Sequence, residues 1–189
     1  MRRDVAAVLL AAVLAGTAAA AGPHFLGPTL THPSTPPRFA LRDQHGVLVR
    51  LAGERGKVVL VTFLYTHCPD LCPLTTQNLN GVLTTLGTKR RDVAVLAISV
   101  DPKGDTPASV KAYVRNHRLL HEFHYLTGTE SELEPIWKAY NVTPLRPGGA
   151  DPDHTLYILA VDRGGKARIL FDALAKESTI AHDVRLLLG

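Results

Sequence analysis

The sequence predicts a single layered α/β domain, and two observations carry that prediction. Two continuous runs of β-branched and other apolar residues, 58–65 and 93–100, are typical of strands buried on both faces at the centre of a sheet. Segments with helical periodicity alternate with such runs, which favours parallel central strands. The 189 residues suffice for one domain with a substantial core, and the 46% of hydrophobic residues argues against a disordered chain.

The predicted helices carry their own local start or stop signals. The helix after the first buried strand has its apolar residues on one face, and Gly87 suits its C-cap. The next helix has Thr106 as N-cap and Pro107 at its first position. The third opens with Thr129 and Glu132, which have the spacing of a capping box. A final amphipathic helix closes the chain.

The remaining strands complete the order of elements. Apolar residues on both sides of 44–46 predict a hairpin ahead of the first buried strand. Further runs predict strands at 123–128, 154–162 and 167–173. The order is then hairpin, β, α, β, α, β, α, β, β, α. A thioredoxin-like arrangement fits this order: a central mixed sheet flanked by helices, with an N-terminal β-hairpin.

Residues 1–21 have the composition of an export signal. Arg2 and Arg3 precede an uncharged run, 5–21, which closes on small residues that fit an A-x-A cleavage pattern. The same 17-residue run reaches the lower limit for spanning a bilayer, so a cleaved signal peptide and a short membrane anchor both remain open. Either predicts export to the periplasm, soluble or tethered to the outer face of the cytoplasmic membrane, where thiols can be oxidised.

Residues 22–37 contain five prolines and predict an extended, mobile linker, which leaves 38–189 as the folded domain. The formal net charge is only +4, and the densest basic group, 89–91, is three residues long. A surface that follows a phosphate backbone needs a larger basic patch, so no nucleic-acid partner is expected.

The chain has two cysteines, Cys68 and Cys72, placed where the first buried strand gives way to a helix. Reactive groups gather at the carboxyl ends of strands in such folds. If both lie at the helix start, their Cβ atoms are roughly 5–6 Å apart, close enough for one metal ion to bridge the sulfurs. A disulfide prefers about 3.8 Å, which a small backbone shift would allow. A structural disulfide, a redox pair and part of a metal site therefore all remain open.

The surroundings of the cysteines favour ionised thiols. A helix N-terminus stabilises the thiolate, the form that both metal binding and thiol exchange need. Asp70 lies between the cysteines and is expected to cap the helix or to bias the local charge. His67 adjoins Cys68, but adjacent side chains rarely point the same way, so a positional role is expected for it.

Two thiolates suit Cu(I), and one added imidazole makes a site that also holds Cu(II). Of the nine histidines, His154 is the distinctive candidate, because it ends a polar loop and begins an apolar strand. The spacing alone does not decide whether it is a ligand.

Three stretches together resemble the Sco/SenC family of copper proteins of respiratory assembly. They are FLYTHCPDLCPLTTQNL around the cysteines, AISVDPKGDTP after the next strand, and DPDHTLYILAVDRGG downstream. The resemblance covers essentially residues 38–188. It implies a thioredoxin-like fold in which Cys68, Cys72 and His154 bind copper. It also implies that Asp153 orients the imidazole of His154 without binding the metal. Asp101 is expected near the same end of the sheet, where it either supports the site or orders its own loop.

The resemblance further implies a role in maturing the dinuclear copper centre of cytochrome c oxidase. One candidate function is a metallochaperone that delivers Cu(I) or Cu(II). The other is an enzyme, a thiol–disulfide oxidoreductase that reduces the acceptor's cysteines with Cys68 and Cys72. The expected partner is the copper-accepting subunit of the oxidase, with another periplasmic copper chaperone or a thiol reductant as further candidates. A structural disulfide is the weakest alternative, because it would close a very small loop and stabilise the fold little.

Overall fold

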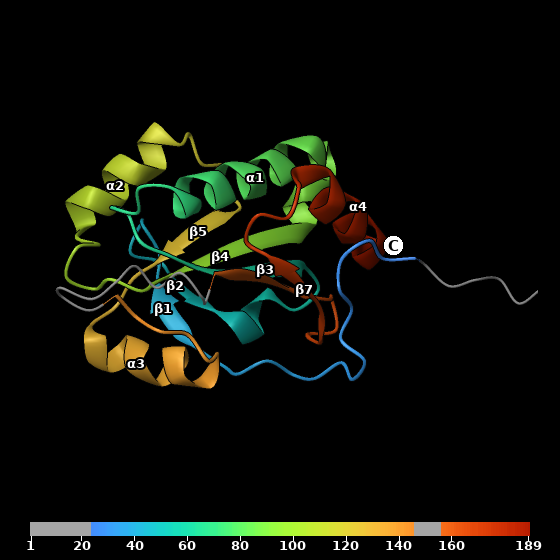
Figure 1. Cartoon of the computed structure of the whole chain (residues 1–189), viewed down its shortest axis with the longest axis horizontal. Coiled ribbons are helices and arrows are strands. Elements are labelled where there is room, and N and C mark those ends of the chain that lie inside the picture. Colours follow the sequence, from blue (N-terminus) through green and yellow to red (C-terminus); the bar gives the residue numbers. More distant parts are fainter. Residues whose placement is uncertain (1–23, 146–155) are drawn as a thin grey trace, which may run out of the picture.

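A mixed β-sheet forms the centre of the computed structural model, which describes residues 24–145 and 156–189. Within these residues its strands are β3 (Val58–Leu64), β4 (Val93–Ser99), β5 (Phe123–Leu126), β6 (Tyr157–Val161) and β7 (Ala167–Asp172). They lie in the order β5-β4-β3-β6-β7 (Figure 1). β3, β4 and β5 run parallel, whereas β6 is antiparallel to both of its neighbours. The predicted mixed sheet is confirmed.

The two long apolar runs form the centre of the sheet. Every residue of β3 and β4 is buried, as their largely apolar sequences predict. The strands pair in parallel register from Val58 opposite Val93 to Leu64 opposite Ser99. Both therefore end at the same edge of the sheet, and the loops that follow them lie side by side.

Helices cover both faces of the sheet. Figure 1 shows α1, α2 and α4 on one side of it and α3 on the other. The helices are α1 (Leu71–Thr85), α2 (Pro107–Asn116), α3 (Glu130–Ala139) and α4 (Glu177–Leu188), and the short 3-10 helices are η1 (Leu51–Glu54) and η2 (Gly87–Asp92). No helix in the described part of the chain is both long and apolar enough to span a bilayer.

The predicted helix caps agree with the structure in α2 and α3. The Thr106 hydroxyl accepts a hydrogen bond from the backbone of Ser109, and Thr129 forms a capping box with Glu132. At the end of α1, Gly87 lies one residue beyond the C-cap and has a φ of +57°. This left-handed conformation suits glycine, and the chain passes directly from it into η2.

The predicted hairpin is also present. It consists of β1 (Ala40–Arg42) and β2 (Leu48–Arg50), which form a separate antiparallel pair. The side chain of Gln44 in its turn bonds the backbone of Phe123 and Tyr125 in β5. These bonds attach the hairpin to the edge of the central sheet.

Residues 24–37, the N-terminal strap, are bound to the domain. Thr29 forms a bridge with Ile169 in β7, and the amide of Leu30 donates to the carbonyl of Arg168 across 2.8 Å. The segment is extended, as predicted. The expectation of a mobile linker is wrong for these residues, because backbone pairing with an edge strand holds them in place.

A buried carboxylate provides a second anchor for the strap. Asp183 of α4 is fully buried and accepts hydrogen bonds from the amides of Leu26 and Gly27, each at 2.8 Å. A Cβ on Gly27 would collide with the ring of Phe171. The strap therefore needs a glycine where it lies against Phe171.

Candidate metal centre

Cys68 and Cys72 lie together at the carboxyl end of β3. Cys68 is in the loop after the strand, and Cys72 lies in the first turn of α1, as predicted. Neither cysteine is in a disulfide; Cys68 is 7% exposed and Cys72 is completely buried. A partner molecule therefore reaches the pair by way of Cys68.

The first turn of the helix stabilises negative charge on Cys68. The amide of Cys72 donates a hydrogen bond to Sγ of Cys68 at 3.2 Å. The pKa of Cys68 is lowered to about 6, mainly by a hydrogen bond from the Cys72 thiol. Burial raises this pKa, but the amides of Cys72 and Asp70 and the side chain of Tyr65 lower it further. Cys68 is therefore mostly thiolate at neutral pH.

Asp70 contributes through its backbone. It occupies the N-cap position of α1, but its exposed side chain makes no capping hydrogen bond. The expectation that its carboxylate caps the helix is wrong, because its φ of −129° and ψ of −69° depart from the extended conformation of a side-chain cap. Its amide instead donates to Cys68.

Asp105 anchors the cysteine loop to the sheet, a role that the sequence did not predict. Its buried carboxylate accepts a hydrogen bond from the amide of Thr66 at 2.8 Å. It also accepts bonds from the hydroxyls of Ser99 at 2.5 Å and Tyr125 at 2.9 Å. Burial raises the pKa of Asp105, and these hydrogen bonds oppose that rise. The Asp105 carboxylate thus links Thr66, two residues before Cys68, to Ser99 in β4 and Tyr125 in β5.

A buried tyrosine interacts electrostatically with the thiols. The hydroxyl of Tyr113 in α2 and that of Thr76 in α1 lie 2.7 Å apart in a buried hydrogen bond. Burial raises the pKa of Tyr113, and negative charge on Cys72 and Cys68 raises it further. Tyr113 therefore stays a neutral hydroxyl while the thiols ionise.

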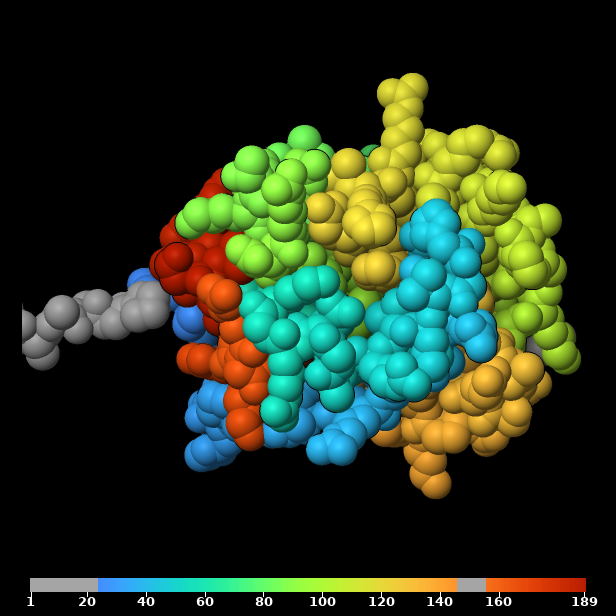
Figure 2. Space-filling model, turned by 180° about the vertical axis from the view of Figure 1, so that it is seen from behind, coloured from blue at the N-terminus to red at the C-terminus, as the bar shows by residue number. Residues whose placement is uncertain are grey.

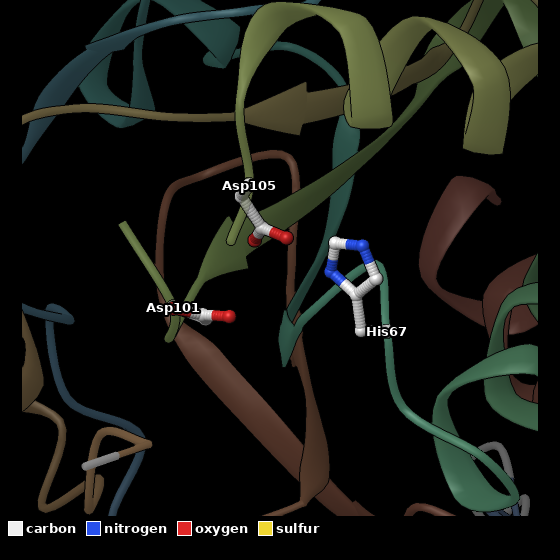
Figure 3. Close-up of side chains that lie close together, drawn as sticks. All are labelled: His67, Asp101 and Asp105. Atoms are coloured by element: carbon white, nitrogen blue, oxygen red, sulfur yellow. The ribbon is translucent and has the colours of Figure 1, made fainter. Parts of the chain in front are cut away.

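His67 and Asp101 lie at the same end of the sheet, as expected for Asp101. Figure 3 shows the imidazole of His67 facing the carboxylates of Asp101 and Asp105. One ligand atom of each residue lies within 4.8 Å of the other two. Asp101 also orders its own loop, since it accepts a bond from the amide of Gly104 at 2.9 Å. His154 and Asp153 lie outside the described residues.

The comparisons with known proteins decide the family. A sequence model of the SCO1/SenC family matches residues 28–189. The chain belongs to the SCO1/SenC family. This member is 30% identical over 147 residues to a SCO2-like protein of Rickettsia typhi, an alignment that covers 74% of this chain and 71% of the relative.

Solved structures of relatives share the fold of this SCO1/SenC protein. A copper-bound structure of Bradyrhizobium japonicum ScoI is 31% identical, with a TM-score of 0.68 over 80% of this chain and 98% of the relative. BsSco is described as having a disulfide switch and as a member of the Sco family of cytochrome c oxidase assembly proteins. Its structure is 26% identical, with a TM-score of 0.70 over 84% of this chain and 97% of BsSco. The predicted thioredoxin-like fold is confirmed.

The geometry of this SCO1/SenC protein suits chemistry at sulfur. Soft thiolates bind soft metal ions, and a thiolate is also the attacking group in disulfide exchange. The two thiols are buried and close together, and Cys68 is ionised, which suits both metal binding and disulfide exchange. The spacing of the cysteines marks both of them in the sequence, whereas Asp105 carries no such signal, because an aspartate just before a helix N-cap is typical of an ordinary turn.

Proposed function

We propose that this protein is an exported metallochaperone that carries copper on Cys68, Cys72 and His154. Its cargo would go to the dinuclear copper centre of cytochrome c oxidase during assembly. The observation that carries the proposal is the buried thiol pair with the low pKa of Cys68, about 6. Membership of the SCO1/SenC family and the copper-bound structure of a relative support it.

The two cysteines provide the soft part of this site. A thiolate binds a metal without first losing a proton, so the low pKa of Cys68 favours loading at neutral pH. Two thiolates suffice for Cu(I), whereas Cu(II) gains from an added imidazole. Release to the acceptor proceeds by ligand exchange, in which the acceptor's ligands replace the thiolates one at a time.

His154 is the proposed third ligand, and both ends of its loop support this. On one side, the amide of Leu145 donates to the carbonyl of Val100, next to β4. On the other side, the carbonyl of Tyr157 accepts a bond from the Thr62 hydroxyl in β3 at 2.9 Å. His154 is three residues before Tyr157, a distance of at most about 10 Å along the chain. This short separation along the chain from a residue bonded to β3 supports His154 as the third ligand. Asp153 is proposed to orient that imidazole.

The second candidate function is thiol–disulfide oxidoreduction by the same cysteines. The thiolate of Cys68 attacks one sulfur of the acceptor's disulfide, and the other sulfur leaves as a thiolate. Cys72 then attacks the mixed disulfide, giving a Cys68–Cys72 disulfide and a reduced acceptor dithiol. The unequal exposure of the two thiols favours Cys68 as the attacking group. The disulfide switch described for BsSco supports a redox role.

The leader, residues 1–21, supports export to the periplasm, where the protein would be soluble or membrane-tethered. There its partner would be the copper-accepting subunit of the oxidase. Another periplasmic copper chaperone would load the site, or a thiol reductant would return the oxidised pair to two thiols.

The deciding experiment is copper binding by the reduced protein, wild type against His154→Ala, with His45→Ala as a control in the distant hairpin turn. Thiolate-to-Cu(II) charge-transfer absorption and metal analysis report the site. We expect His154→Ala to lose the Cu(II) absorption while keeping one Cu(I), and His45→Ala to match wild type. Unchanged Cu(II) spectra and affinity in His154→Ala would refute the three-ligand site.

A second assay separates the two functions. Metal-free reduced protein is mixed with an oxidised peptide that carries the acceptor's cysteines, and free thiols are followed over time. Reduction that requires Cys68 and Cys72 but proceeds in His154→Ala supports the oxidoreductase. If the peptide is not reduced at a useful rate, the oxidoreductase function is refuted and the metallochaperone function remains.

A further inference from the structure

A second group of metal-ligating side chains lies beside the cysteines and uses none of their atoms. His67 comes from the loop after β3, Asp101 from the loop after β4, and Asp105 from the approach to α2. Figure 3 shows the imidazole facing both carboxylates. One ligand atom of each lies within 4.8 Å of the other two. Side-chain shifts of roughly 1–2 Å would bring them to the spacing of ligands around one ion, whose bonds are about 2.0–2.2 Å long.

The two carboxylates are already held in place. Asp105 is oriented by Thr66, Ser99 and Tyr125 through hydrogen bonds of 2.5–2.9 Å. Asp101 accepts a bond from the amide of Gly104, and a Cβ at position 104 would collide with the Asp101 carboxylate. His67 is exposed, and its Nδ1 lies 3.1 Å from the Thr66 hydroxyl, a surface hydrogen bond that an ion would replace. A site with fixed ligands loses little side-chain freedom on binding.

In the part of the chain that the structure describes, no lysine or arginine forms an ion pair with Asp101 or Asp105. Asp105 is only 5% exposed, so its charge is poorly compensated by water. A divalent cation between the carboxylates and His67 would supply that compensation.

We propose that His67, Asp101 and Asp105 form a second cation site, with one imidazole nitrogen and two carboxylate oxygens as ligands. This donor set suits borderline divalent ions of the first transition row, and Cu(II) binds most tightly in that series. The site differs in chemistry from the thiol pair, which prefers soft ions. It does not depend on the proposed function, because a site without sulfur binds its ion whether or not Cys68 and Cys72 carry copper.

The test removes the thiol site and titrates with Cu(II) alone. In the full chain with Cys68→Ser, Cys72→Ser and His154→Ala, we expect one Cu(II) per chain. Its electron paramagnetic resonance spectrum should show coupling to a single imidazole nitrogen. Adding His67→Ala should abolish this coupling, and adding Asp101→Asn should weaken binding at least tenfold. His121→Ala, on another surface, is the matched control and should change nothing.

Reduced wild-type protein provides the complementary measurement. His67→Ala should remove one bound Cu(II) and leave the thiolate charge-transfer absorption intact. Loss of that absorption in His67→Ala would place the imidazole in the thiolate site and overturn the proposal. Unchanged binding after His67→Ala in the thiol-free chain, or equal losses with His67→Ala and His121→Ala, would also overturn it. Failure of the thiolate site itself would show as missing charge-transfer absorption in wild type, and is thus distinguishable.

Discussion

The amide of Cys72 donates a hydrogen bond to Sγ of Cys68, so the two cysteines are coupled before any metal or disulfide joins them. The bond exists because Cys72 lies in the first turn of α1, where backbone amides have no partner within the helix. The geometry thus gives Cys68 the thiolate and leaves Cys72 as the buried donor.

Cys72→Ala should raise the pKa of Cys68. The thiol of Cys72 is the largest cause of the lowered value, about 6, and the backbone donors alone cannot replace it. Alkylation rates measured against pH report the thiolate fraction. Wild type should show a midpoint near 6 and the variant a higher one. Identical midpoints would refute the assignment of the donor.

The stability of the reduced protein should fall as pH is lowered. The pKa of Cys68 is depressed in the folded state, so the unfolded state takes up the proton first. The contribution of Cys68 is complete above about pH 9, the usual value for the thiol, and is lost as pH falls to about 6. Urea denaturation across this range should show a steeper loss in wild type than in Cys68→Ser. Equal slopes would contradict the prediction.

Asp105→Asn should destabilise the protein by roughly 1–3 kcal/mol. The NH2 group of the asparagine is a donor, so it would face one of the three groups that donate to the carboxylate and leave it without an acceptor. Urea denaturation measures the loss, and copper affinity should fall with it as the cysteine loop loosens. Asp92→Asn is the exposed control, expected within about 0.5 kcal/mol of wild type. A loss no larger than the control's would show that Asp105 is dispensable.

Gly27→Ala should release the N-terminal strap. The added methyl group would collide with Phe171, at a cost of about 1–3 kcal/mol. Hydrogen exchange should then accelerate at the amide of Leu170, which is bonded to the carbonyl of Pro28. Gly53→Ala is the matched control, since its new Cβ would lie 3.8 Å from the nearest atom. Equal exchange in the two variants would argue against the strap as an anchored element.

Most of the fold could be predicted because its signals are local. The apolar runs of β3 and β4 and the caps at Thr106 and Thr129 depend on residues a few positions apart. Asp70 was misjudged because its cap depends on backbone angles that its residue type does not specify. The strap was misjudged because its prolines indicate extended backbone but do not reveal that β7 offers an edge to pair with.

By itself, the sequence determined the order of strands and helices, the pairing of Cys68 and Cys72 at a strand end, and the resemblance to the SCO1/SenC family. Periodicity and short-range spacing carry that information. Only the tertiary structure decided that Cys68 is the ionised thiol and that Asp105 holds its loop from 39 positions along the chain. It also brought His67 to face Asp101 and Asp105. These features depend on burial and on contacts across the sheet, which arise only when the strands pack side by side.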